Sequence, residues 1–199
     1  MKIALFGGTF NPPHQGHVNL ARGVWKELQP DRLLVMPTGL PPHKAMPTGS
    51  ASNEERYEMT LLAFSSIPGV TVSRLELERG GASYTSDTLK TLRREFPTDE
   101  LILTVGGDMF LTLDRWHEAE TIFREATIAA AARNEEERQT MEEAAEIYRK
   151  RYQASVTILK TPVVEISSSE IRADLHSGRM PTLLPEAVAD YIREKGLYR

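Results

Sequence analysis

Residues 2–17, KIALFGGTFNPPHQGH, are the most informative segment of this 199-residue chain. Residues 2–6 form an apolar run typical of a buried strand. Residues 7–17 form a turn with paired glycines, two prolines and two histidines. Apolar residues then recur with helical spacing, at Val18, Ala21, Trp25 and Leu28. A strand, a glycine-rich turn and a helix in this order predict an anion-binding site.

The turn has the features that such a site needs. Gly7 and Gly8 let the backbone approach a bulky anion, and the helix directs its unpaired N–H groups and positive dipole end to the same place. His14 and His17 lie three residues apart at the head of this helix, so both can face the anion as donors that protonate easily near neutral pH. We therefore predict phosphate as the ligand and these two histidines as catalytic residues.

The common phosphate motifs do not fit this stretch. No Lys-Ser/Thr pair follows Gly16, and no third glycine completes G-x-G-x-x-G, which excludes a P-loop and a dinucleotide fingerprint. The residues present are Gly8-Thr9-Phe10-Asn11-Pro12 and then His14-x-Gly16-His17, which together resemble the H-x-G-H nucleotidyltransferase family. A zinc site is one alternative, although it needs two more ligands and the chain has no cysteine. A purely structural pair of histidines is the other.

Composition restricts the class of protein. A chain of 199 residues with 40% hydrophobic and 26% charged residues is long enough for one α/β domain and short for two, so we expect a single domain over residues 1–199. The net charge of −4 indicates neither nucleic-acid nor membrane binding, so local donors must bind any anionic substrate. Because cysteine is absent and the first residues predict a strand rather than a signal peptide, we expect a cytoplasmic protein without disulfides.

Short apolar runs alternate with amphipathic stretches along the chain. This pattern predicts a Rossmann-like α/β fold, a doubly wound and mainly parallel sheet with helices on both faces. Further strands are predicted at residues 33–36, 70–77, 101–105, 127–131 and 156–159. Helices are predicted after the capping box Ser52-x-x-Glu55, after the turn at residues 80–88, and across residues 134–153, where an acidic start and a basic end suit the helix dipole.

Candidate ligand-binding residues follow two of these strands, at the edge where open α/β sheets bind their ligands. The proline-rich loop at residues 37–52 carries His43 and Lys44, of which Lys44 is the better candidate; a solvated surface loop is the alternative. Asp108 follows two glycines and is suited to accept ribose hydroxyl hydrogen bonds, to cap a helix, or to do both. Trp116 fits either the core or a stack on a flat ring.

The last motif is Ile166-Ser167-Ser168-Ser169-Glu170-Ile171-Arg172. Its Ser167-x-x-Glu170 capping box predicts a helix start, which alone would explain the serines. The hydroxyls, the N–H groups of the helix start and Arg172 one turn later also make a polyphosphate cradle. The pattern I-S-S-S-x-I-R resembles the second hallmark of the H-x-G-H family.

The resemblance covers essentially the full length and is closest to the bacterial nicotinate mononucleotide adenylyltransferases. It implies transfer of AMP from ATP to nicotinate mononucleotide in NAD biosynthesis, with nicotinate adenine dinucleotide and pyrophosphate as products. It also implies that Mg²⁺ is bound with ATP and has no protein ligands.

The catalytic residues that the resemblance implies are His14, His17, Lys44 and Arg172. The ATP-binding residues that it implies are Gly7, Gly8, Thr9, Phe10, His14, His17, Gly106, Asp108, Ile166, Ser167, Ser168, Ser169 and Arg172. For nicotinate mononucleotide they are Asn11, Lys44, Tyr84, Thr85, Trp116 and His117.

The chain departs from the family at one place. After Arg133 the family often continues with Pro-Gly-Tyr, whereas this chain has Asn134-Glu135-Glu136, so the contacts of the usual loop are not carried over. Oligomeric state varies in this family, which leaves a homo-oligomer open.

Three rival functions remain. A pantetheine-phosphate adenylyltransferase or a cytidylyltransferase would share the motifs, although Trp116 and the Tyr84-Thr85 turn suit a flat anionic ring better. A non-catalytic nucleotide sensor is the alternative from another class, and it would not need His14, His17 and Arg172 together.

Overall fold

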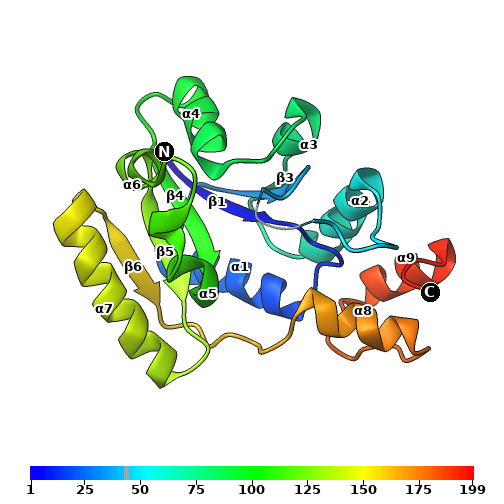
Figure 1. The fold of residues 1–199 in the computed structure, drawn as a ribbon. Helices are drawn as coiled ribbons and strands as arrows, with labels where there is room; N and C mark the ends of the chain where they lie inside the picture. The colour runs from blue at the N-terminus through cyan, green and yellow to red at the C-terminus, as the bar shows by residue number, and fades with distance from the viewer. Residues whose placement is uncertain (43–44) are drawn as a thin grey trace.

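The computed structural model describes residues 1–42 and 45–199. This part of the chain contains one sheet of six strands in the order β3-β2-β1-β4-β5-β6, all parallel (Figure 1). The strands are β1 (Lys2–Gly8), β2 (Arg32–Pro37), β3 (Val70–Val72), β4 (Glu100–Gly106), β5 (Thr127–Ala131) and β6 (Val156–Leu159). This strand order reverses between β1 and β4, so the predicted Rossmann-like, doubly wound sheet is confirmed.

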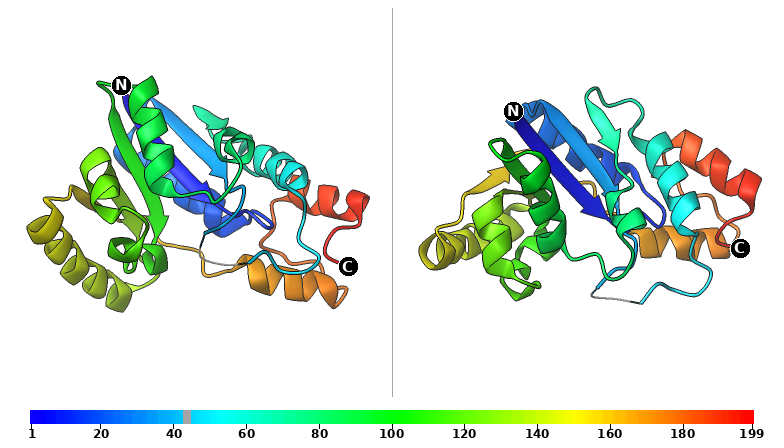
Figure 2. Two further views of the ribbon diagram at one scale, coloured as in Figure 1. Left: turned by 45° about the horizontal axis from the view of Figure 1, so that its top comes forward. Right: turned by 90° about the horizontal axis from the view of Figure 1, so that it is seen from above.

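Helices cover both faces of the sheet. The helices of one face are α1 (Gln15–Leu28), α2 (Asn53–Phe64), α8 (Ser168–His176) and α9 (Glu186–Lys195). Those of the other are α3 (Leu75–Arg79), α4 (Thr85–Glu95), α5 (Gly107–Phe110), α6 (Ala119–Glu125) and α7 (Glu135–Tyr152), with a 3₁₀ helix at Leu113–Arg115. Figure 2 shows α2, α8 and α9 gathered on one side of the molecule and α6 and α7 on the other. No helix in the described part is both long and apolar enough to span a bilayer.

The inner strands β1, β4 and β5 are buried on both faces, as the short apolar runs predict. Ala4 and Phe6 of β1 belong to the core under α1 and α2, whereas Ile3 and Leu5 belong to the core under α4 and α6. Successive side chains of a strand point to opposite faces, so one apolar run supplies both cores.

β3 is shorter than the sequence predicted. The expected strand at residues 70–77 ends at Val72, and Leu75–Arg79 forms α3 instead, so that part of the prediction was wrong. β3 is an edge strand whose last ladder bond runs from Ser73 N–H to Val35 C=O. The Ser73 hydroxyl then accepts a hydrogen bond from Leu75 N–H at 3.2 Å, which turns the chain out of the sheet.

Local capping signals were more reliable. Both predicted capping boxes are present, at Ser52 with Glu55 and at Ser167 with Glu170. The helix predicted at residues 134–153 is α7, which begins one residue later and ends one residue earlier. α1 begins at Gln15 rather than at Val18, because His14 C=O already accepts hydrogen bonds from the N–H groups of His17 and Val18.

Candidate active site

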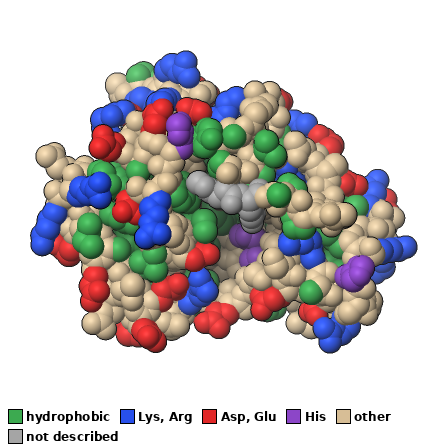
Figure 3. Space-filling view, viewed as in Figure 1, with side chains coloured by type: hydrophobic (Ala, Val, Ile, Leu, Met, Phe, Trp, Pro, Cys, Tyr) green, Lys and Arg blue, Asp and Glu red, His purple; other side chains and the backbone are tan. Residues whose placement is uncertain are grey.

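The two sequence motifs meet at the carboxyl edge of the sheet, beside the end of β1. The Ser168 hydroxyl donates a hydrogen bond to Pro12 C=O at 2.9 Å across 156 residues of sequence. Arg172 Nη1 donates to Asn11 C=O at 2.7 Å across 161 residues. The heads of α1 and α8 therefore border the same place, as Figure 1 also shows. The surface is hollowed near the centre of this face, where histidine side chains are visible (Figure 3).

The segment that leads from β6 to α8 is tied to α1. The Glu27 carboxylate accepts hydrogen bonds from Lys160 N–H at 2.8 Å and from Thr161 N–H at 2.7 Å. Gly23 makes this approach feasible, since a Cβ there would lie 2.5 Å from Thr161 Oγ1. Gly16 of the H-x-G-H motif has a similar role, because a Cβ there would lie 3.0 Å from Val164 C=O. Both glycines thus bring the second motif to the first.

The two histidines form a stacked pair at the head of α1. Their ring centroids lie 3.7 Å apart with planes inclined by 24°. His14 N–H donates to His17 Nδ1 at 3.2 Å, so in the neutral imidazole of His17 the proton is carried by Nε2. The Phe10 ring meets the His17 ring edge-on, with centroids 5.0 Å apart. Backbone and aromatic contacts thus determine both the tautomer and the orientation of His17.

His14 differs from the expectation that both histidines protonate easily. It is 5% exposed, and this burial lowers its pKa to about 4, against a smaller raising effect of Glu170. Its imidazole is therefore neutral at pH 7 in the absence of ligand and offers one N–H donor. Among the described residues of the two motifs, Arg172 and the N-termini of α1 and α8 then supply positive potential.

The turn between β1 and α1 is held in place by hydrogen bonds from residues that were not predicted from the sequence. Arg56 is fully buried and donates to Thr9 C=O at 2.6 Å and to Gly39 C=O at 3.3 Å. The Tyr198 hydroxyl donates to Asn11 Oδ1 at 2.8 Å. The Asn11 amide also binds Ser50 Oγ and Ala51 N–H. The predicted role of Asn11 in binding the mononucleotide stays a prediction, and in this structure its side chain holds the turn together.

The glycines of the turn have unequal surroundings. A Cβ on Gly7 would meet no protein atom within 4 Å, so the backbone there borders open space. A Cβ on Gly8 would lie 2.9 Å from the Phe10 ring. Phe10 has a φ of +47°, in the left-handed region, and its buried ring packs on Phe6 and Phe64. Gly7 thus leaves room for a ligand, whereas Gly8 is needed for packing.

Two of the residues predicted to bind nicotinate mononucleotide, Tyr84 and His117, come from separate segments and lie together in the structure. The rings of Tyr84 and His117 lie 4.2 Å apart with planes inclined by 34°. Tyr84 is the N-cap of α4 and Thr85 its first residue, and no side chain caps this helix. Capping by a side chain therefore does not account for the hydroxyl residues at this helix start. Trp116 is half-buried and packs against the core on the α4 and α6 face.

Asp108 lies at the head of the short helix α5, where Gly106 is the N-cap, so the expected capping role of Asp108 is wrong. Its carboxylate is largely exposed and lies 3.9 Å from Arg133 Nη2. Glu137, another residue that sequence reasoning missed, accepts a hydrogen bond from Arg133 N–H. A Cβ on Gly107 would lie 2.8 Å from the Glu137 carboxyl group, so Glu137 packs closely on the end of β4.

The remaining predicted residues are placed as follows. Ile166 packs partly buried against the core, Ser167 caps α8, and Ser169 Oγ accepts from Arg172 Nη2 at 3.2 Å. His43 and Lys44 lie outside the described residues, so their predicted roles stay predictions. Within residues 1–42 and 45–199, no group of three or more His, Asp or Glu side chains is arranged to hold a metal ion.

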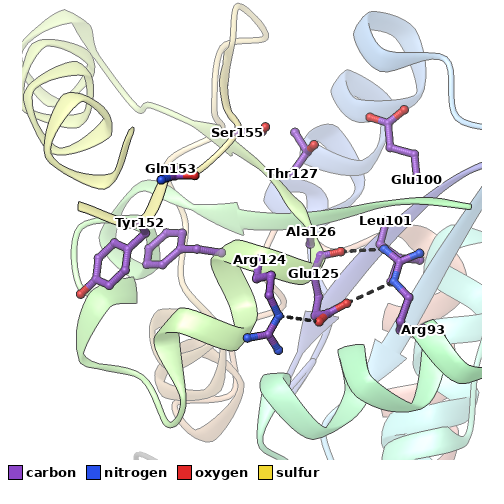
Figure 4. A pocket seen from close by; sticks show the side chains of 11 residues that line it. Arg93, Glu100, Leu101, Arg124, Glu125, Ala126, Thr127, Tyr152, Gln153 and Ser155 are labelled. Carbon is purple, nitrogen blue, oxygen red and sulfur yellow. Dashed lines mark hydrogen bonds and ion pairs between the residues drawn. The ribbon is translucent and has the colours of Figure 1, made fainter. Parts of the chain in front are cut away.

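A separate cavity of about 330 Å³ lies at the amino end of β4 and β5 (Figure 4). Three of its charged side chains pair with one another, since Glu125 accepts from Arg93 Nε at 3.2 Å and from Arg124 Nε at 2.9 Å. Open α/β sheets bind ligands at the opposite, carboxyl edge. We therefore assign the site to the hollow between α1, α4 and α8.

Fold and site together are those of a nucleotidyltransferase. The cytidylyltransferase-like family matches residues 5–174. Curated relatives described as probable nicotinate-nucleotide adenylyltransferases include those of Thermus thermophilus, 44% identical over the whole of both chains, and of Neisseria meningitidis serogroup B, 39% identical over 99% of this chain and 98% of that one. The chain belongs to the cytidylyltransferase-like family and, within it, to the nicotinate-nucleotide adenylyltransferases.

Solved structures agree on the fold. The nicotinic acid mononucleotide adenylyltransferase of Plasmodium falciparum complexed with NaAD has a TM-score of 0.80 at 20% identity, covering 98% of this chain and 96% of that one. The same enzyme complexed with APC has a TM-score of 0.79 at 20% identity, covering 100% and 98%. These structures agree with the fold, and the family model and the curated relatives confirm the family that the two motifs predicted.

Proposed function

We propose that this chain transfers the AMP group of ATP to nicotinate mononucleotide, releasing pyrophosphate and forming nicotinate adenine dinucleotide. The observation that carries the proposal is the meeting of the two motifs, in which Ser168 and Arg172 bond to the backbone of the turn that precedes His14. The names of the relatives at 44% and 39% identity support the same activity.

The ATP phosphates would lie between the heads of α1 and α8. In the proposed step, an oxygen of the mononucleotide phosphate attacks the α-phosphorus of ATP, and the bond from that phosphorus to the pyrophosphate oxygen breaks. Pyrophosphate leaves with the bonding electrons, and no covalent enzyme intermediate forms. The reaction then needs placement and charge neutralisation, which His17 Nε2–H, Arg172 and two helix N-termini are suited to supply.

No serine nucleophile is needed for this step. The Ser168 hydroxyl is already engaged with Pro12 C=O, and Ser169 Oγ accepts from Arg172. Guanidinium and N–H groups fit phosphate oxygens, and Mg²⁺ prefers oxygen ligands to imidazole, so we propose that Mg²⁺ enters with ATP. When bound, Mg²⁺ would neutralise part of the triphosphate charge. Asp108 would accept hydrogen bonds from the adenosine ribose.

The acceptor would lie at the head of α4. Its uncapped first turn offers N–H donors to a carboxylate or phosphate, and Tyr84 and His117 provide flat side chains beside it. Trp116 would stack on the pyridine ring. An amide in place of the nicotinate carboxylate would turn its NH₂ group toward at least one donor, which favours nicotinate.

We place the reaction in the cytoplasm and propose no nucleic-acid or membrane partner, in line with a net charge of −4.

The test is pyrophosphate release from ATP with a panel of phosphorylated acceptors: nicotinate mononucleotide, nicotinamide mononucleotide and 4′-phosphopantetheine. We expect the highest kcat/KM with nicotinate mononucleotide. Preference for 4′-phosphopantetheine would replace the acceptor assignment. Binding of ATP without turnover of any acceptor would favour a sensor.

A further inference from the structure

Glu76 is a buried carboxylate that the proposed reaction does not use directly. It belongs to α3 and is 6% exposed. Its Oε1 accepts a hydrogen bond from the Thr88 hydroxyl at 2.8 Å, and Arg79 Nη1 donates to the same hydroxyl at 3.0 Å. A carboxylate is costly to bury unless such donors surround it. The residues that are bonded to Glu76 therefore show which part of the structure it stabilises.

Glu76 lies beneath the junction of two loops at the carboxyl edge of the sheet. The loop after β2 and the turn before α4 pair through a parallel bridge between Leu40 and Ala82. Ser83 strengthens this junction, since its Oγ accepts from Gly39 N–H at 3.1 Å and its N–H donates to Leu40 C=O at 2.9 Å. A Cβ on Gly39 would lie 2.7 Å from Glu76 C=O, so the loop packs directly on α3.

The side chain of Glu76 accepts hydrogen bonds from hydroxyl groups of both loops. Burial raises its pKa, whereas a hydrogen bond from Thr88 and the charge of Arg79 lower it. Hydrogen bonds from the hydroxyls of Ser83 and Thr38 also oppose the effect of burial, and the net result is a raised pKa of Glu76. Serine hydroxyls beside a helix start usually cap the helix. Here the Ser83 hydroxyl is directed to Glu76 and Gly39 instead, and no side chain caps α4.

We propose that Glu76 is a positioning residue for the acceptor substrate. By holding Ser83 and Thr88 on the inner side of the turn, it keeps Tyr84 and the first N–H groups of α4 directed toward nicotinate mononucleotide. This inference rests on the function proposed above and adds to it how the acceptor turn is held. The ATP side is held by different contacts, from Glu27, Ser168 and Arg172, so the two sides should respond separately.

The test is Glu76→Gln, which keeps the size of the side chain and removes its charge. We expect KM for nicotinate mononucleotide to rise about 10- to 100-fold, because hydrogen bonds to a charged group are lost and the competent turn is less populated. KM for ATP should stay within about twofold. KM values that are both unchanged, or that rise by the same factor, would overturn the inference.

Glu125→Gln is the matched control. Glu125 is also a partly buried, paired carboxylate, but it lies at the opposite edge of the sheet (Figure 4). The Glu125→Gln variant should have a lower melting temperature and unchanged KM values for both substrates. A rise in its KM for nicotinate mononucleotide would assign the effect to general destabilisation.

If Glu76→Gln does not fold, Thr88→Val should raise the KM for nicotinate mononucleotide and Thr88→Ser should restore it. Lack of wild-type turnover would refute the proposed function instead.

Discussion

The two ring nitrogens of His17 have different predicted tasks, and substitutions can separate them. Nδ1 accepts the His14 N–H at 3.2 Å, whereas Nε2 carries the proton proposed to reach the α-phosphate of ATP. An asparagine places an amide atom near the position of Nδ1, and a glutamine places one near Nε2. His17→Asn, His17→Gln and His17→Ala therefore keep the first contact, the second, or neither.

The two contacts should affect different quantities. Loss of the acceptor for His14 N–H removes a helix-cap hydrogen bond, which costs about 1 kcal/mol of unfolding free energy in His17→Ala and His17→Gln. Loss of a donor to a developing oxyanion costs about 3–4 kcal/mol, or about 10²–10³ in kcat, in His17→Ala and His17→Asn. KM for ATP should change little, because this donor acts mainly in the transition state.

Urea unfolding and steady-state pyrophosphate release on the same preparations provide both quantities. The expected pattern is a stable but slow His17→Asn enzyme and a less stable but faster His17→Gln enzyme. A His17→Asn enzyme with nearly wild-type kcat would refute the donor role. Loss of stability and loss of kcat in parallel across all three variants would show that His17 acts only through the helix cap.

Three further predictions concern the same region. The pKa of His14 is lowered to about 4, so between pH 6.5 and 4 the unfolded state binds a proton that the folded state does not; the unfolding free energy should fall by up to about 3 kcal/mol as the pH drops through this window, and urea unfolding of His14→Asn should lack that part of the slope. Gly16→Ala should lower kcat although alanine favours helix by about 1 kcal/mol, because its Cβ would lie 3.0 Å from both Val164 C=O and His14 Nδ1; wild-type kcat would contradict this. Tyr198→Phe should cost about 1–2 kcal/mol in chemical unfolding through the lost hydrogen bond to Asn11, and an unchanged midpoint would show that this bond is not stabilising.

Local signals in the sequence were sufficient for most of the fold. The apolar run at residues 2–6, the glycine turn and the capping boxes at Ser52 and Ser167 each depend on a few neighbouring residues, and the structure has all of them. The strand predicted at residues 70–77 is present but ends at Val72, because the edge of the sheet offers it no second partner and Leu75–Arg79 forms α3 instead. α9 went unpredicted, although Val188 and Ile192 have helical spacing.

The class of fold, the family and the residue types of the site were predictable from the amino-acid sequence, because periodicity, capping and motif spacing are properties of short stretches. Tertiary structure alone decided that Arg56 lies fully buried under Thr9, that the Asn11 amide is held by protein partners, and that His14 is neutral at pH 7. Burial, pKa and contacts across 161 residues depend on how distant elements pack, and no local pattern encodes them.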